Sequence, residues 1–407
     1  MIPVDTMRKI DWRVGIPLCF FLSGINRLSR WFKKKSSVPS PKKILFIQIS
    51  EMGSIVLAYS LFAKTRKQFP EAEFYFLTFS ENRSAVEILD IFPETNIKTI
   101  EGKNLWTFLY STVRVLRSLR KLKVDLTLDL ELFSRFTSAV SYLSGAHCRS
   151  GFYKFHNEGL YRGTFLTHKT SYNPHIHIAF NFIGLLDTFL FPERDQPAPK
   201  IPLAQDNILL PAKKISLENQ KKIRQKLINE NQSAADAKKL ILMNPNASEL
   251  IPIRRWPPDR YVKLAKQLLQ HPGVFIILTG TSSERAEAEY IRSAINSPCC
   301  LNLAGRTSFS ELIDLYNIAD ILITNDSGPV HFSAMTKIRS FIFFGPETPK
   351  LYGPLGKNSH VFYSSFFCSP CVSAFNQRKS ACKDNKCLQA IAVEDVYKEI
   401  APFILDE

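Results

Sequence analysis

Short apolar runs alternate along this chain with longer segments whose apolar residues recur every three or four positions. The runs have the length of buried strands, and the longer segments have the period of helices that pack on one face. Because strand and helix follow each other in turn, the pattern predicts parallel sheets covered by helices on both faces, an α/β fold. The predicted strands are 44–49, 73–79, 126–130, 239–244, 274–280, 321–324 and 341–344, and the predicted helices are 55–69, 105–122, 133–144, 216–229, 258–270, 283–295 and 309–317.

Two such series are separated by a stretch without periodicity. Phe191–Pro211 contains five prolines, which predicts a connection between domains. A chain of 407 residues is long enough for two complete cores. We therefore predict an N-terminal domain at 41–205 and a C-terminal domain at 206–407, each built on a Rossmann-like parallel sheet.

Residues 1–40 differ from both series. Ile16–Ile25 is an apolar run well short of the ~20 residues that span a bilayer, and no small-residue cleavage site follows it. The basic and aromatic stretch Arg27–Lys35 comes next, and a linker is predicted at Ser36–Pro41. Such a composition is typical of a segment that lies on an anionic membrane surface. The alternative is an N-terminal helix that packs on the protein body with a solvated basic end.

The charge of the chain indicates an acidic partner. Hydrophobic residues make up 45% and charged residues 22%, as in ordinary globular proteins, but the net charge is +16. An anionic membrane face, a phosphorylated glycolipid or a nucleic acid would each fit this charge. The chain contains no recognisable nucleic-acid-binding module, so we predict no nucleic-acid partner.

Four of the eight cysteines gather near the C-terminus. Cys368 and Cys371 have the spacing of zinc ligands, but Cys382 and Cys387 are spaced too widely for the usual knuckle. A structural zinc ion, a disulfide or redox pair, and reduced thiols in a packed loop all remain open. We favour the thiols over the zinc ion.

The segment Thr324–His331 carries the clearest chemical signal. It follows an apolar run and precedes a helical pattern, so it predicts a strand that ends in a polar turn before a helix N-terminus. Free backbone N–H groups at such an end bind anions. Asp326 and Ser327 are good N-cap residues, and Gly328 would let the backbone approach a ligand closely.

Together with four other segments in the same order, this segment resembles the motifs of glycosyltransferase family 9, which includes the ADP-heptose:lipopolysaccharide heptosyltransferases. The five segments are Lys43–Ser54, Val124–Leu130, Asn244–Pro257, Leu303–Leu312 and Thr324–His331. The resemblance covers roughly residues 41 to 400. It implies the GT-B architecture, in which two Rossmann-like parallel-sheet domains face a central cleft. It also implies inverting transfer of a sugar, heptose by preference, from a nucleoside-diphosphate sugar to a phosphorylated glycolipid of the lipopolysaccharide-core type. The enzyme would be cytoplasmic and peripheral on the inner face of the cytoplasmic membrane.

The resemblance and the strand ends together predict a donor site in the C-terminal domain. A guanidinium at Arg254 or Arg255 would hold the diphosphate in bidentate fashion, and the resemblance favours Arg254. Glu284 would bond to ribose hydroxyls or else complement its own helix dipole. His331 is either a ligand or a packing residue. The predicted donor-binding residues are Asn246, Ala247, Arg254, Thr279, Gly280, Glu284, Gly305, Asp326, Ser327, Gly328 and His331.

The catalytic base is where this chain departs from the family pattern. The family carries an aspartate directly after the glycine of the first loop, and this chain has Ser54 there. A serine is no base by itself at neutral pH. We predict that Glu51 supplies the carboxylate, with Asp129 and Glu131 as alternatives. No DxD pair is placed as a metal clamp, so we predict no catalytic metal ion and no cofactor.

Two other functions stay open. The missing aspartate would also fit a catalytically impaired protein that binds a nucleotide sugar or glycolipid as a scaffold. An epimerase of GT-B type fits the order of the motifs less well. Candidate acceptor contacts in the N-terminal domain are Lys64, Arg66, Arg114, Arg117, Arg135, Arg149 and His177.

Overall fold

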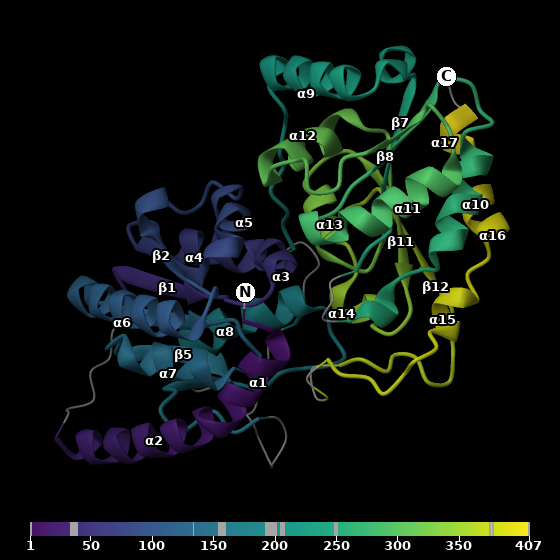
Figure 1. Cartoon of the computed structure of the whole chain (residues 1–407). Coiled ribbons are helices and arrows are strands. Elements are labelled where there is room, and N and C mark those ends of the chain that lie inside the picture. The colour runs from purple at the N-terminus through teal and green to yellow at the C-terminus, as the bar shows by residue number, and fades with distance from the viewer. Residues whose placement is uncertain are drawn as a thin grey trace. The chain divides into compact units, whose positions relative to one another are not determined.

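The chain forms two compact units, Met1–Leu209 and Leu210–Glu407, as the computed structural model in Figure 1 shows. The sequence placed this division at 205/206. Most of the proline-rich connection and of the predicted linker at Ser36–Pro41 lies outside the described residues. The structure describes residues 2–32, 40–132, 134–153, 160–191, 202–203, 208–247, 251–373, 376 and 378–405.

The first unit is built on a six-stranded sheet in the order β3-β2-β1-β4-β5-β6, with every neighbouring pair parallel. Its strands are β1 (Lys43–Ile47), β2 (Glu73–Phe79), β3 (Ile97–Ile100), β4 (Leu126–Asp129), β5 (Cys148–Phe152) and β6 (His168–Thr170). Its helices are α1 (Val4–Arg13), α2 (Gly15–Phe32), α3 (Met52–Leu57), α4 (Tyr59–Gln68), α5 (Arg83–Glu87), α6 (Leu105–Leu122), α7 (Arg135–Leu143) and α8 (Ile178–Leu190), with 3-10 turns η1 (Ser80–Asn82) and η2 (Glu94–Asn96).

The second unit repeats this plan, with strand order β12-β11-β10-β7-β8-β9 and parallel pairing throughout. Its strands are β7 (Lys239–Asn244), β8 (Val274–Leu278), β9 (Cys300–Asn302), β10 (Ile321–Asn325), β11 (Arg339–Phe344) and β12 (Ser359–Tyr363). Its helices are α9 (Leu217–Glu230), α10 (Pro258–Leu268), α11 (Arg285–Ile295), α12 (Phe309–Ile318), α13 (Gly328–Ser333), α14 (Pro349–Tyr352), α15 (Lys386–Gln389), α16 (Val393–Ile400) and α17 (Pro402–Leu405), with 3-10 turns η5 (Gln232–Asp236), η6 (Pro252–Arg254) and η7 (Ser282–Glu284).

Both sheets have the doubly wound Rossmann order, which confirms the predicted fold class. Counted within its own unit, each sheet reads 3-2-1-4-5-6, so the order reverses between β1 and β4 and between β7 and β10. Ligands of open α/β sheets bind at the carboxyl ends of the strands beside this reversal. The topology therefore predicts ligand sites in the loops after β1 and β4 and in those after β7 and β10.

Two features of this architecture were not predicted correctly from the sequence. The segment expected as one helix at 55–69 forms α3 and α4, because the backbone of Ala58 ends the first helix and begins the second. Five short strands, β3, β5, β6, β9 and β12, were not predicted. All five have three to five residues, and several are only partly buried, so no clear apolar run marks them.

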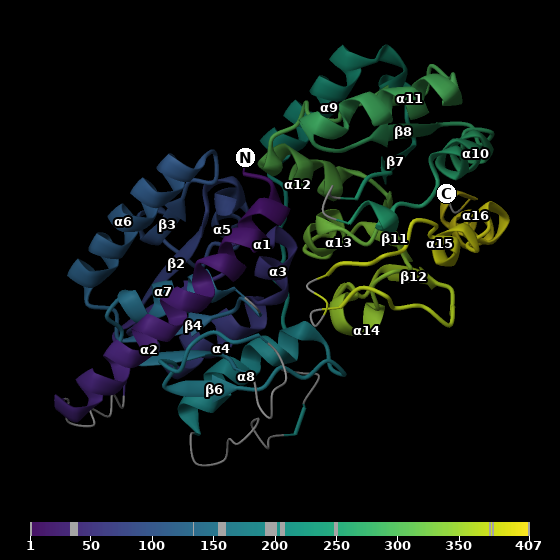
Figure 2. The ribbon, with the colours of Figure 1, turned by 60° about the horizontal axis from the view of Figure 1, so that its bottom comes forward.

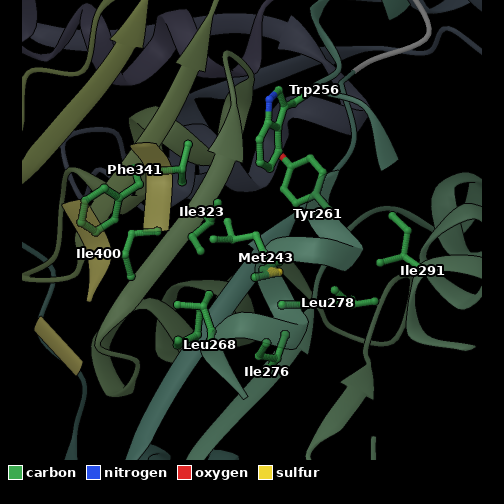
Figure 3. Close-up of a cluster of buried hydrophobic side chains, with 14 of the residues drawn as sticks. Met243, Trp256, Tyr261, Leu268, Ile276, Leu278, Ile291, Ile323, Phe341 and Ile400 are labelled. Atoms are coloured by element: carbon green, nitrogen blue, oxygen red, sulfur yellow. The ribbon is translucent and has the colours of Figure 1, made fainter. Parts of the chain in front are cut away.

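The core of the second unit fixes the loops beside its strand reversal. Figure 3 shows Trp256 and Tyr261 among apolar side chains of the strands and helices, and Trp256 is fully buried and stacks on Phe343 with ring centroids 4.4 Å apart. Asn325, at the end of β10, accepts a hydrogen bond from the backbone N–H of Trp256 at 2.8 Å. Its amide also donates to the carbonyl of Pro245 at 2.7 Å. One buried asparagine therefore joins the β7 loop to the end of β10.

The N-terminal helices pack on the body of the first unit. Figure 2 shows α1 and α2 along the side of the unit that carries α7. Asp11 forms an ion pair with Arg135 of α7 at 3.1 Å, and Cys19 and Leu22 are buried against Ala139. The alternative of a helix packed on the protein body is therefore what the structure shows for the inner face of α2.

No helix among the described residues has both the length and the apolar character needed to cross a membrane.

Candidate functional site

In the first unit, the loop after β1 brings Glu51 and Ser54 together. Glu51 occupies the N-cap position of α3, and its side chain does not cap the helix. Instead the Ser54 hydroxyl donates a hydrogen bond to Glu51 Oε2 at 2.6 Å. Ser54, at the position where the family carries an aspartate, is thus hydrogen-bonded to the carboxylate that was predicted to take the place of that aspartate. Glu51 is partly exposed.

Glu131, which follows β4, lies behind this loop and holds it in place. Its carboxylate accepts hydrogen bonds from the backbone N–H groups of Ile49 and Ser50 at 2.8 and 2.7 Å and from the Ser50 hydroxyl. Burial raises the pKa of Glu131 to about 7, and the charge of Glu51 adds to the rise, whereas the bonds from Ser50 oppose it. A buried carboxyl group beside a second carboxylate holds its proton more tightly than a solvated one does.

Asp129 occupies a structural position. It is fully buried, and its carboxylate forms an ion pair with buried Arg162 and accepts a hydrogen bond from the Thr137 hydroxyl at 3.1 Å. No oxygen of this carboxylate faces solvent, so Asp129 can meet an acceptor hydroxyl only after these contacts break. The geometry therefore contradicts Asp129 as the base and favours Glu51.

Most of the candidate acceptor contacts are already engaged within the protein. Lys64 pairs with Asp187 at 2.5 Å, and Arg66 donates to the carbonyl of Ala72 and lies over the ring of Phe74. Arg135 is buried against Asp11. Of the four remaining candidates, Arg149 donates to backbone carbonyls, and His177 caps α8. Arg114 and Arg117 lie exposed on α6.

In the second unit, the ends of β7 and β8 bring three predicted donor residues together. Asn246 is buried, and its side-chain amide has no hydrogen-bond partner among the described residues. A Cβ atom at Gly280 would lie 3.2 Å from this amide nitrogen and 3.1 Å from Glu284 Oε2. Glu284 Oε2 accepts the backbone N–H of Thr281 at 2.7 Å, so the carboxylate caps its own helix, which is the structural alternative named for it.

Gly305 closes the same edge of the sheet. Its φ angle is +69°, and a Cβ atom there would lie 2.6 Å from the Cα of Ser282. The backbone N–H of Gly305 donates to the carbonyl of Gly280 at 2.9 Å. The loops after β8 and β9 can approach this closely only with glycine, because both the backbone angle and the space exclude a side chain.

We expect Gly305→Ala to lower the free energy of unfolding by about 1–3 kcal/mol, as strained backbone positions do. Urea denaturation measures the change. Gly328→Ala is the matched control, since Gly328 is helical and the nearest atom to a Cβ there lies at an ordinary 3.4 Å. An equal loss in the two variants would contradict the argument from φ and close approach.

Arg254 and two buried carboxylates form a second group beside the strand reversal. Arg254 Nη1 lies 3.3 Å from Asp326 Oδ2, and the Nε of Arg254 is buried without a partner among the residues described. Burial raises the pKa of the nearby Glu347 to about 7; Arg378 opposes the rise, and the charge of Asp326 adds to it. A guanidinium with an unused donor next to buried carboxylates suits a ligand that carries both phosphate and hydroxyl groups.

Glu347 was not among the residues predicted from the sequence. It follows Phe344-Gly345-Pro346 directly after β11. The signal was the same as for the other residues, a polar side chain just past an apolar strand. It went unused because nothing in the sequence shows that β11 lies next to β10.

The other residues considered for the donor site are buried or make hydrogen bonds within the protein. Arg255 donates to the carbonyl of Ala247 at 3.2 and 3.1 Å and pairs with Glu287, so it supports the loop. Ser327 bonds to the carbonyl of Asn325 rather than capping α13. His331 is buried on α13, which has only six residues. Thr279 is buried, and its carbonyl accepts the Asn244 amide at 3.2 Å.

The C-terminal cysteines lie around one cavity. Cys368, Cys371, Cys382 and Cys387 are free thiols, and all four line a cavity of about 490 Å³. Burial raises the pKa of the Cys387 thiol. Within the described part of the chain, no group of three or more His, Cys, Asp or Glu side chains is arranged to hold a metal ion.

Comparison with known proteins gives a consistent family match. The model of the family described as glycosyltransferase family 9 (heptosyltransferase) matches residues 112–381. Lipooligosaccharide heptosyltransferase 2 of Haemophilus ducreyi is 27% identical over 328 residues, which cover 78% of this chain and 88% of that protein. The protein of the same name from Haemophilus influenzae is 31% identical over 135 residues, 32% of this chain, so the match spans only 39% of that protein.

Solved structures resemble the whole fold. The ADP-heptose lipopolysaccharide heptosyltransferase II of E. coli has a TM-score of 0.68 and 22% identity, covering 89% of this chain and 98% of that one. A glycosyltransferase family 9 protein from Veillonella parvula has a TM-score of 0.70 and 18% identity, covering 92% of this chain and 100% of that one. At these identities the likeness concerns the fold.

Proposed function

Because this chain belongs to glycosyltransferase family 9, we propose that it transfers a heptose from a nucleoside-diphosphate heptose to a phosphorylated glycolipid of the lipopolysaccharide-core type. The relatives named heptosyltransferase support heptose as the sugar. The basic charge of the chain, +16 in total, supports an acceptor that carries phosphate.

One observation carries the proposal: buried polar atoms without partners lie at the reversal of the second sheet. The Asn246 amide and the Arg254 Nε are both buried without hydrogen-bond partners among the described residues. Such groups cost free energy unless something bonds to them. They follow β7, beside the strand reversal where nucleotides bind in this fold. We assign Arg254 to the diphosphate and Asn246, Gly280 and Gly305 to the walls of the donor pocket.

The proposed reaction is a single displacement. Glu51 takes the proton of an acceptor hydroxyl group, and the oxygen attacks the anomeric carbon of the donor sugar. The bond from that carbon to the diphosphate oxygen breaks, and its electron pair leaves with the nucleoside diphosphate. Arg254 stabilises the negative charge that develops there. A single displacement inverts the configuration at the anomeric carbon.

We propose that the reaction uses neither a resident cofactor nor a catalytic metal ion. Arg254 supplies the positive charge that a metal would otherwise bring to the leaving group. We also place the protein at the inner face of the cytoplasmic membrane, where its lipid acceptor would be made. The eight cysteines are all free thiols, which suits a reducing compartment.

The test is a thermal-shift comparison of ADP-heptose with ADP-, GDP- and UDP-hexoses on the full chain. A ligand that binds only the native state stabilises it by about 2.7 kcal/mol at a hundred times its dissociation constant. We expect ADP-heptose to raise Tm and UDP-sugars to leave it unchanged. No shift with any nucleotide sugar, in folded protein, would overturn the donor site.

A non-catalytic scaffold is the second candidate, and Ser54 in place of the family aspartate is the observation behind it. Binding of ADP-heptose without release of ADP in the presence of acceptor would favour this candidate. The 2.6 Å bond between Ser54 and Glu51 leads us to expect turnover instead.

A further inference from the structure

Helix α2 carries apolar residues on two opposite faces. The inner face, which includes Cys19 and Leu22, is buried on the body of the unit. The hydroxyl of Ser23 accepts the backbone N–H of Thr164 at 2.9 Å, and a Cβ atom at Gly15 would lie 2.9 Å from the side chain of Arg135. The helix is therefore held in one rotation about its axis, and its other face is fixed outward.

The outer face of α2 is an exposed apolar stripe. Its members recur at alternating intervals of four and three residues, which places them on one side of a helix. Between 36% and 65% of the surface of each of these residues is exposed to solvent, far more than for packed residues. An exposed stripe of this kind marks a binding surface. The stripe consists of Val14, which directly precedes α2, and of Leu18, Phe21, Ile25 and Leu28 on the helix, and Phe20 beside it is 75% exposed.

Helix α6 carries a second exposed apolar stripe. It is formed by Leu105, Trp106, Leu109, Tyr110 and Val113, and Trp106 is 82% exposed. Both α2 and α6 contact α7, and all three helices lie on one side of the first sheet in Figures 1 and 2. The N–H of Ile2 also donates to the carbonyl of Gly102, just before α6, at 2.8 Å. The fold thus brings the N-terminal helices next to the second stripe.

The charges around the stripes decide which partner fits. Gly15–Phe32 contains no acidic residue, and neither does 102–124. Arg27 on α2 and four cations on α6 are exposed, the latter being Arg114, Arg117, Arg120 and Lys121. Self-association through these faces would bring like charges together, whereas an anionic bilayer neutralises them while its acyl region takes up the apolar groups. Tryptophan and tyrosine are the residues that favour the boundary between lipid and water.

We propose that the outer faces of α2 and α6 form a membrane-docking surface that lies on an anionic lipid bilayer. The inference rests on the proposed function in one respect, that a glycolipid acceptor resides in such a bilayer. It adds α6 to the N-terminal segment that the sequence indicated, and it assigns the contact to named side chains.

Sedimentation with vesicles tests the surface on the full chain. The vesicles contain phosphatidylglycerol and phosphatidylethanolamine, and pure phosphatidylcholine vesicles serve as the uncharged comparison. We expect the double variant Phe21→Gln/Ile25→Gln and the single variant Trp106→Gln each to weaken binding roughly tenfold or more, from the apolar area lost. Added salt should weaken wild-type binding as well. Leu217→Gln is the matched control, because Leu217 is about as exposed as Trp106, at 78% against 82%, but lies on α9 of the other unit.

Three outcomes would overturn the proposal. They are unchanged vesicle binding in both variants, equal binding to uncharged vesicles, and a change of oligomeric state in light scattering with no vesicle binding by the wild type. The last would identify the stripes as an interface between copies of the chain. Circular dichroism of each variant excludes unfolding. Donor binding is measured separately by thermal shift without lipid, so failure of the docking surface is distinguishable from failure of the donor site.

Discussion

Glu51→Gln is expected to lower kcat for sugar transfer by roughly 10²- to 10⁴-fold, the usual contribution of a positioned general base. The amide keeps the size of the side chain and can still accept the hydrogen bond that Ser54 donates at 2.6 Å. It cannot take a proton from an acceptor hydroxyl group. Because the donor nucleotide contacts are assigned to the other unit, the dissociation constant for ADP-heptose should stay unchanged. Steady-state transfer kinetics and thermal shift measure the two quantities.

Two companion variants sharpen this test. Ser54→Ala removes one hydrogen bond to a charged group and should cost about tenfold in kcat. Adding Ser54→Asp to Glu51→Gln restores a carboxylate in the same loop, at the family position, and should recover part of the lost rate. Wild-type kcat in Glu51→Gln would place the base elsewhere, and Glu131 would then be the carboxyl group to replace.

The fold was predictable where an individual strand could be recognised from its own apolar run. Central strands such as β1 and β10 are buried along almost their whole length, and their apolar runs are unmistakable. The missed β12 lies at a sheet edge and is only partly buried at every position, because an edge strand has a neighbour on one side alone. The break between α3 and α4 at Ala58 was invisible for a different reason. The helical period of apolar residues continues through Ala58, so the break is seen only in the backbone conformation of the structure.

The candidate site was predictable where chemistry sits directly at a strand end. Asp326 was named from its place after an apolar run and Arg254 from the family resemblance, and the two side chains lie 3.3 Å apart. A sequence does not show whether a charged residue already forms an ion pair within the folded protein. Asp129 was named as an alternative base and Arg135 as a candidate acceptor contact, but Arg162 and Asp11 engage them. Those partners come from segments separated by 33 and 124 residues, and only the folded chain brings them together.

Arg254→Ala is expected to lower kcat/KM for the nucleotide-sugar donor by about 10³-fold. The guanidinium is assigned to the leaving diphosphate, and groups that stabilise developing charge in a water-poor site contribute effects of this size. Arg254→Lys keeps the charge beside Asp326 but loses the planar fork that binds phosphate oxygens in pairs. It should therefore fall between wild type and alanine in kcat/KM, with a smaller loss of stability. Initial rates at varied donor concentration give kcat/KM, and urea denaturation gives the free energy of unfolding.

Arg255→Ala separates the role of Arg254 from that of its neighbour. Arg255 bonds to the carbonyl of Ala247 and to Glu287, so its removal should loosen the β7 loop and cost about 1–2 kcal/mol of stability, as lost hydrogen bonds to charged groups do. Its effect on kcat/KM should be clearly smaller than that of Arg254→Ala. The reverse order would mean that Arg255 holds the diphosphate. In that case Arg254 would serve mainly to neutralise Asp326 and Glu347, two buried carboxyl groups that a cation must accompany whenever both are ionised.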